Sequence, residues 1–144
     1  MTPASVNVRL DPGVKYQVYA ALVDIAGDPG QSMSIALRFD GSSSIYYSSG
    51  GGKLALSDSN EKLRSIVREF LLRSCQIVPD MQQTSVFPLP GPNETAVYLK
   101  CGEGVFTMTI TEEEKRENSN KGYMAYLIGG LLKAYQDAGL IGQN

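Results

Sequence analysis

The sequence predicts an α+β fold in which an antiparallel sheet of two hairpins packs against about three helices. Two observations carry this prediction. Short runs of alternating apolar residues occur in two pairs joined by turn signals, and apolar residues at helical spacing occur before, between and after those pairs. Strands joined by short turns pair antiparallel, and the apolar face of such a sheet needs amphipathic helices to cover it. The expected order is helix, hairpin, helix, hairpin, helix in a single domain over residues 1–144.

The first helix is expected between Asp11 and Gly27. Asp11 followed by Pro12 has the form of an N-cap and a first helical residue, and Gly27 supplies a stop. The apolar residues at helical spacing are Val14, Val18, Ala21, Leu22 and Ile25. A strand is the alternative, because a second set of apolar positions in the same segment alternates: Tyr16, Val18, Ala20 and Leu22.

The first hairpin and the central helix follow. The strand from Ser34 to Phe39 turns at Asp40-Gly41 and returns over residues 45–48, and Gly50 to Gly52 end the hairpin. Asp58, followed three residues later by Glu61, has the form of a capping box. The helical stripe that it opens continues to about Ser74 and consists of Leu63, Ile66, Val67, Phe70 and Leu71.

A stiff proline-containing connection leads to the second hairpin, which comprises Thr95–Cys101 and Val105–Ile110. Thr111 to Glu114 resembles another capping box, but Asn118-Ser119-Asn120 interrupts it. The last helix is expected over residues 121–138, with Gly139 as its stop.

The composition excludes several kinds of site. Among 144 residues there is no His, so the commonest general base and the commonest zinc ligand are both absent. The net charge is −2, from 13 Lys and Arg against 15 Asp and Glu, which provides no basic surplus for nucleic acid. We expect no catalytic residues, no metal and no cofactor, and a protein that acts by binding a protein partner.

Two charged or glycine-rich motifs have ordinary structural interpretations. Gly50-Gly51-Gly52-Lys53 lacks the spacing of a phosphate-binding loop, because Leu54 to Leu56 separate it from any helix start. The acidic run Glu112, Glu113, Glu114 and Glu117 occupies one turn. Carboxylates that cleave glycans must instead converge across a cleft, so a solvated helix start is the better interpretation.

Two short polar motifs remain as candidates for partner binding. Ser57, Asp58 and Ser59 stand at the expected start of the central helix, where one side chain serves as the cap and another hydroxyl is left for a partner. Gly102, Glu103 and Gly104 form the expected turn of the second hairpin. An acid between two glycines at a hairpin apex is either an ordinary polar turn or a carboxylate offered to polar or cationic groups of a partner.

Cys75 and Cys101 allow two arrangements. A disulfide would close the loop between them, and two independently buried thiols are the alternative. The residues alone leave both open.

The size of the chain and its glycine-framed loops, Ser57-Asp58-Ser59 and Gly102-Glu103-Gly104, resemble those of periplasmic immunity proteins of type VI secretion. The closest likeness is to the lipoprotein-type inhibitors of muramidase effectors that cut peptidoglycan. The resemblance implies a protein without catalytic activity that pushes polar loops into the substrate groove of the effector. In that role Ser57, Ser59 and Glu103 would contact the cleft.

The resemblance also implies a periplasmic location. The lipobox cysteine of such lipoproteins does not stand in this chain, so we expect that a signal or lipobox segment has been removed and that residues 1–5 form a flexible tether. The rival interpretation is a small cytosolic adaptor or secretion chaperone that binds a partner through apolar helix faces, with reduced cysteines. A third class, a glycan-cleaving enzyme using Glu103, would need a second converging carboxylate.

Overall fold

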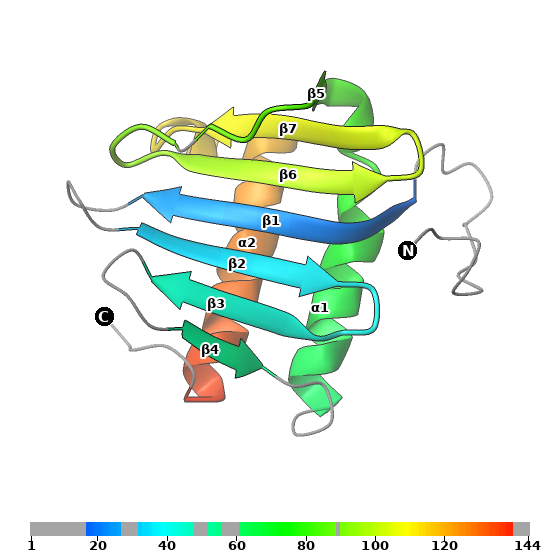
Figure 1. Ribbon diagram of the computed structural model, residues 1–144. Coiled ribbons are helices and arrows are strands. Elements are labelled where there is room, and N and C mark those ends of the chain that lie inside the picture. Colours follow the sequence, from blue (N-terminus) through cyan, green and yellow to red (C-terminus); the bar gives the residue numbers. More distant parts are fainter. Residues whose placement is uncertain (1–16, 27–31, 48–51, 56–60, 89, 140–144) are drawn as a thin grey trace.

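The computed structural model describes residues 17–26, 32–47, 52–55, 61–88 and 90–139 (Figure 1). Its elements, in chain order, are β1 (Val18–Ala26), β2 (Ser32–Arg38), β3 (Ser43–Tyr47), β4 (Gly52–Ala55), α1 (Glu61–Ser74), the 3-10 turn η3 (Val78–Asp80), β5 (Gln82–Thr84), β6 (Thr95–Cys101), β7 (Gly104–Ile110), the 3-10 turn η4 (Glu114–Arg116) and α2 (Asn120–Asp137).

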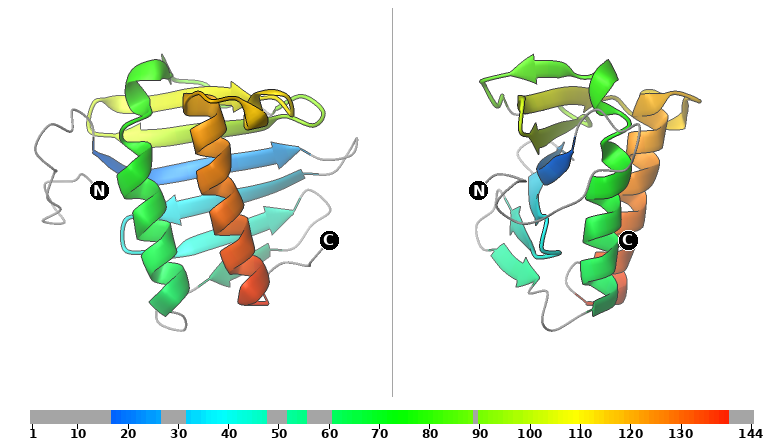
Figure 2. Two further views of the ribbon diagram at one scale, coloured as in Figure 1. Left: turned by 180° about the vertical axis from the view of Figure 1, so that it is seen from behind. Right: turned by 90° about the vertical axis from the view of Figure 1, so that its right-hand side faces the viewer.

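The described strands form one sheet of seven, in the order β4-β3-β2-β1-β6-β7-β5, and every neighbouring pair is antiparallel. Both helices lie on the same face of this sheet and cross its strands (Figures 1 and 2). The predicted α+β class is therefore confirmed, with a two-layer arrangement of sheet and helices.

The expected first helix is wrong. Residues 18–26 form β1, the central strand, which pairs with β2 on one side and β6 on the other. Strands with one solvent-exposed face usually alternate apolar and polar residues, but β1 has buried side chains on both faces. Val23 faces the core and is fully buried, while Asp24 on the opposite face is only 5% exposed. An apolar run buried on both faces resembles a helical stripe in sequence, which explains the error. Asp11 and Pro12 lie outside the described residues.

The first predicted hairpin is confirmed as β2 and β3. Its turn is stabilised by Asp40, whose Oδ1 accepts hydrogen bonds from the Ser42 backbone N–H at 2.8 Å and from the Ser42 hydroxyl at 2.6 Å. Gly41 has a φ of 91°, a conformation that favours glycine. The sequence analysis ended this hairpin at Gly50 to Gly52, whereas Gly52–Ala55 forms a further strand, β4, on the edge of the sheet.

The helical stripes of α1 and α2 pack against the sheet in one apolar core. The fully buried large side chains are Tyr135, Ile35, Leu37, Ile45, Ile77, Leu99, Ile110, Met124, Leu131, Val23, Val67 and Val78. The predicted helix over 121–138 is confirmed as α2, which begins after Ser119, whose Oγ accepts from the Gly122 N–H at 3.3 Å. Gly139, with φ of 75°, stands just after its end as predicted.

Three glycines of α2 provide a stability test. A Cβ added at Gly129 or Gly130 would meet no atom within 4 Å, so Gly130→Ala should stabilise the protein by about 0.5–1 kcal/mol through the lower backbone entropy of alanine when unfolded. A Cβ at Gly122 would lie 1.8 Å from the Glu117 carbonyl oxygen, so Gly122→Ala should destabilise it. Denaturant unfolding of the two variants measures this, and equal effects would contradict the described environment of α2.

Candidate functional site

The predicted turn at residues 102–104 exists and is held in place by a neighbouring strand. β6 and β7 pair along their whole lengths and close at Cys101 opposite Gly104, which leaves Gly102 and Glu103 as the two residues of the loop. The side-chain amide of Gln83, on β5, donates to the main-chain oxygen of Glu103 at 2.9 Å. The backbone of the apex is therefore anchored from outside the hairpin.

Gly104 is required at this site for two reasons. Its φ of 137° lies in a region that residues other than glycine rarely adopt. A Cβ at this position would lie 2.5 Å from Gln83 Nε2. Gly102 has open space around it. Gly104 therefore permits the hydrogen bond from Gln83 to the Glu103 main chain, which we call the Gln83 clamp. Gly102 leaves open space on the other side of Glu103 for a partner.

The carboxylate of Glu103 is exposed at this apex. In the hydrogen bonds between described residues, Glu103 takes part through its main-chain oxygen and not through its side chain. A charged group on a fixed backbone, with its oxygens still solvated, is chemically suited to accept hydrogen bonds from a partner's N–H, O–H or cationic groups.

Ser57, Asp58 and Ser59 lie outside the described residues, so their expected capping and binding roles stay predictions. The structure does place the helix that follows them. Arg64 Nε and Arg68 Nη2 both donate to the main-chain oxygen of Asp40, each at 3.2 Å, so the first half of α1 lies beside the β2–β3 turn. α1 runs across the strands of the sheet (Figures 1 and 2).

The two turns that matter here lie at the same end of the strands. The β2–β3 and β6–β7 turns are three strand spacings apart in the sheet order, about 14 Å at the usual strand separation. α1 passes behind both, with its first half near the former and its last turn near the latter (Figure 1). Whether the segment before α1 shares one partner groove with Glu103 remains a prediction.

Cys75 and Cys101 are both buried and both present as thiols in the structure. Cys75 Sγ donates to the Leu72 carbonyl oxygen at 2.7 Å. Burial raises the pKa of the Cys101 thiol to about 12, with further contributions from the Glu103 carboxylate and from Cys75. The structure thus brings the two cysteines and the Glu103 apex into one region, although they come from different elements.

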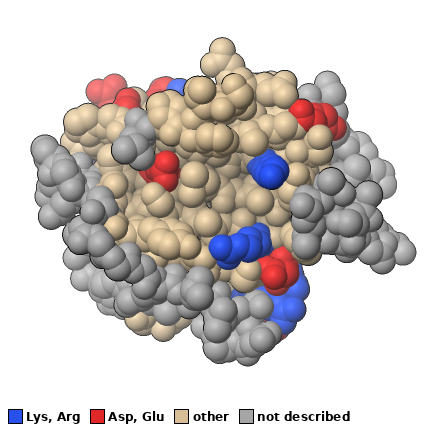
Figure 3. Space-filling view, in the orientation of Figure 1, with Lys and Arg blue, Asp and Glu red and all other residues tan. Residues whose placement is uncertain are grey.

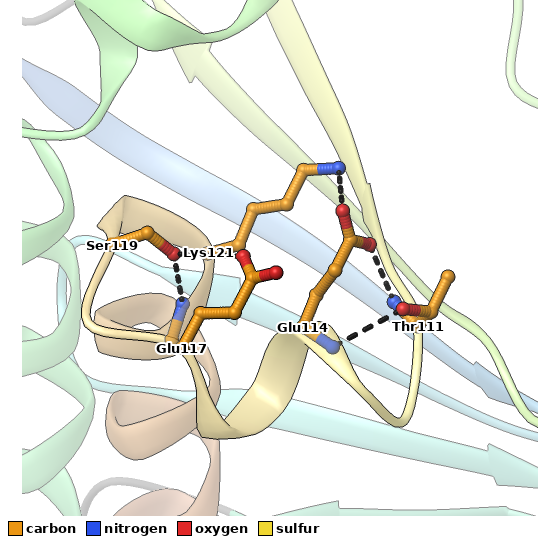
Figure 4. Close-up of polar contacts among 6 residues, drawn as sticks. Thr111, Glu114, Glu117, Ser119 and Lys121 are labelled. Carbon is orange, nitrogen blue, oxygen red and sulfur yellow. Dashed lines mark hydrogen bonds and ion pairs between the residues drawn. The ribbon is translucent and has the colours of Figure 1, made fainter.

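The acidic run belongs to the connection between β7 and α2 (Figure 4). Thr111 and Glu114 bond reciprocally: the Thr111 N–H donates to Glu114 Oε1 at 2.9 Å, and the Glu114 N–H donates to Thr111 Oγ1 at 3.2 Å. Lys121 Nζ approaches the other carboxylate oxygen of Glu114 at 2.7 Å. The predicted capping box is therefore present, but it opens the short turn η4, and Ser119 caps the helix that follows.

The sequence analysis missed the segment Ser85–Pro88, which we call the strap. It follows β5 and is attached to β6, where Tyr98 Oη donates to the Pro88 carbonyl oxygen at 2.7 Å. The Phe87 ring lies against the Tyr98 ring, with centroids 5.0 Å apart, yet Phe87 stays 52% exposed. An aromatic residue beside a proline was the only signal in the sequence, and it is too common to identify a surface.

The sheet face that the helices do not cover carries few charged side chains (Figure 3). Lys100 is one of them, and its Nζ lies 6.0 Å from the centre of the Tyr19 ring. A separate groove of ≈ 620 Å³ lies between α1 and α2, lined by Phe70 and Leu127 among others, with Tyr126 75% exposed beside it. The lining of this groove is mostly apolar but also includes Glu69, Arg73 and Lys133.

Within the ranges given above, no group of three or more Asp, Glu or Cys side chains is arranged to hold a metal ion. No helix in that part of the chain has the length and hydropathy needed to cross a membrane.

The Glu114 contacts predict a pH dependence. Its hydrogen bond with Lys121, and next that from the Thr111 N–H, hold the pKa of the Glu114 carboxyl below its usual value. A lowered pKa means that the stabilisation is complete above the unfolded-state pKa, about 4.3 for Glu, and is lost as the pH falls from there through the folded-state pKa. Glu114→Gln should therefore flatten the acid limb of the unfolding free energy, whereas Glu113→Gln should leave it unchanged. Parallel limbs for wild type and Glu114→Gln would refute the assignment.

The cysteines predict a pattern of alkylation. Because both are buried and the pKa of Cys101 is raised to about 12, iodoacetamide at a pH of about 8 should react slowly with the folded protein. After unfolding without reductant, mass spectrometry should find two added groups. A mass two hydrogens lower, with no alkylation before reduction, would instead show a disulfide and favour an oxidising compartment.

No family model matches the chain, and comparisons with curated proteins and with solved structures find no match either.

Proposed function

We propose that this protein is a binding protein without catalytic activity, an immunity protein that inhibits a secreted peptidoglycan hydrolase of the muramidase class. The exposed Glu103 carboxylate on an anchored hairpin apex supports a binding role. The class of the partner is what the resemblance of the glycine-framed loops to immunity proteins implies. In this role the apex enters the substrate groove of the enzyme and excludes the glycan. The expected site of action is the periplasm, where such an enzyme meets its substrate.

The anchoring of the apex favours binding on energetic grounds. A loop that is already held in its bound shape loses little conformational entropy when it docks. The β6–β7 pairing and the Gln83 clamp provide this preorganisation for the Glu103 backbone. The remaining cost is the desolvation of one carboxylate, which hydrogen-bond donors or a cation in the groove can offset.

The shape of the apex also fits a groove. Enzyme clefts are concave and mostly apolar, with a small number of polar groups that orient the ligand. A two-residue turn with a single acidic side chain is a narrow convex feature of complementary chemistry. Ser57 and Ser59 are proposed as additional polar contacts from the segment before α1.

A second candidate function is supported by the groove between α1 and α2. Its apolar lining and the 75% exposed Tyr126 suit an adaptor or chaperone that binds an apolar segment of a partner. In this candidate function, substitution of Tyr126 should weaken partner binding and substitution of Glu103 should not. Variants of these two residues therefore distinguish the two functions.

The test is the inhibition of a muramidase effector of type VI secretion, measured as the clearing of a cell-wall suspension. Wild-type protein should inhibit it at stoichiometric amounts. Glu103→Ala should weaken binding in calorimetric titration by about 2–5 kcal/mol, because it leaves the donors of the groove unpaired. Its thermal midpoint should stay near that of wild type, because the carboxylate is exposed and bonds no described residue.

The matched control is Glu113→Ala, which removes an exposed acid at the other end of β7 and should leave inhibition intact. If Glu103→Ala still inhibits the enzyme fully, the Glu103 carboxylate does not contribute to inhibition and the prediction is wrong. Loss of binding with Tyr126→Ala but not with Glu103→Ala would favour the adaptor function instead.

A further inference from the structure

Three arginines from both layers of the protein meet at the β2–β3 turn. Arg64 Nε and Arg68 Nη2, on α1, both donate to the main-chain oxygen of Asp40, each at 3.2 Å. These two nitrogens are therefore at most twice that distance, about 6.4 Å, from each other. Arg38 Nη1, at the end of β2, donates to the Ser42 hydroxyl at 3.5 Å, and that hydroxyl donates to the Asp40 carboxylate. The three guanidinium groups thus surround one turn.

Uncharged oxygen atoms hold these guanidinium groups in place. The two from α1 share the main-chain oxygen of Asp40, which has two lone pairs to offer. Gly41 makes room for one of them, because a Cβ at this position would collide with Arg64 Cγ. Arg38 Nη2 donates to the hydroxyl of the buried Ser44 at 2.8 Å. These contacts orient the guanidinium groups without neutralising their charge.

The charges of the described residues that bond to one another at this turn do not balance. Three guanidinium groups stand against two carboxylates, those of Asp40 and Glu61, which leaves an excess of one positive charge. Arg64 and Arg68 are also four residues apart on α1, a spacing at which like charges destabilise a helix. Both lie in the first half of α1, where the helix dipole favours anions over cations. An anion bound at the turn would relieve all three effects.

We propose that Arg38, Arg64 and Arg68 form a binding site for the phosphate group of a small soluble molecule. The excess positive charge and about half a charge from the N-terminal end of α1 match the charge of a phosphate monoester, about −1.5 to −2 at pH 7. One guanidinium fork already satisfies both oxygens of a carboxylate, whereas a phosphate offers further oxygens to a second fork. At N···O distances of about 2.7–2.9 Å, two oxygens of one phosphate can bridge the two guanidinium groups of α1.

A membrane is a less suitable source of the phosphate than a soluble molecule. Segments that bind anionic lipid surfaces gather about four to eight basic residues, whereas this turn has three and keeps two acids among them. The chain as a whole carries a net charge of −2, which opposes its approach to an anionic surface. The arginine site does not depend on the proposed immunity function, since neither Glu103 nor its turn takes part in it.

The experiment is an NMR titration of the protein with inorganic phosphate at a pH of about 8, where phosphate is mostly divalent, with the ionic strength held constant by sodium chloride. The backbone N–H signals of Gly41 and Ser42 should shift and saturate. Arg68→Gln should raise the phosphate Kd about tenfold. Arg68→Lys should raise it by a smaller factor, because lysine keeps the charge and loses the planar fork.

A second variant and a matched control accompany these. Arg38→Gln should also raise Kd, although it changes β2 and not α1. Arg73→Gln replaces an exposed arginine in the last turn of the same helix and should leave Kd within about twofold of wild type. Unfolding midpoints are measured for every variant. That of Arg68→Gln should stay near wild type, because the Asp40 oxygen keeps its hydrogen bond from Arg64.

Saturable shifts that weaken in Arg68→Gln and Arg38→Gln, at unchanged unfolding midpoints, would support the site. Shifts that grow linearly with phosphate and are reproduced by sodium chloride would show charge screening alone and overturn it. An equal loss of affinity in Arg73→Gln would also overturn it, since the charge of the whole protein would then suffice. So would binding to vesicles of phosphatidylglycerol without binding of inorganic phosphate, which would assign the arginines to a membrane.

Discussion

The pairing of β1 with β2 and β6 is the interaction on which the rest of the structure depends. It joins the β2–β3 hairpin, which ends at Tyr47, to the β6–β7 hairpin, which begins at Thr95, although 47 residues separate them in the sequence. Without it, each hairpin would be a small sheet of marginal stability. With it, the sheet is wide enough for α1 and α2 to bury their apolar stripes side by side. The same pairing places the β2–β3 and β6–β7 turns at one end of the sheet.

The candidate site follows from this arrangement. β7 receives β6 on one side and the short strand β5 on the other, and β5 supplies Gln83 to the Glu103 apex. The strap then leaves β5 and returns to Tyr98 on β6. β5 therefore connects the Glu103 apex, which Gln83 binds, to the strap, which Tyr98 holds on β6.

Much of the fold could be predicted from sequence because its signals are local. The Asp40-Gly41 turn, the turn at residues 102–104 and the stripe of α2 each depend on residues within a few positions of one another. The same holds for the exposed acid, since a hairpin apex points away from the sheet. The prediction failed for β1 because its burial on both faces, Val23 on one and Asp24 on the other, gives an apolar run that also fits helical spacing.

By itself, the sequence determined the α+β class, the two hairpins, the acid at the apex and the presence of the last two helices, which the structure places at Glu61–Ser74 and Asn120–Asp137. Only the tertiary structure decided that residues 18–26 form a strand, that β4 and β5 complete the edges, and that Gln83 clamps Glu103. It also decided that Cys75 lies near Cys101 and that Phe87 remains half exposed. The physical reason is that caps, turns and stripes are short-range preferences, whereas strand pairing, burial and electrostatic contact depend on partners that only the folded chain brings together.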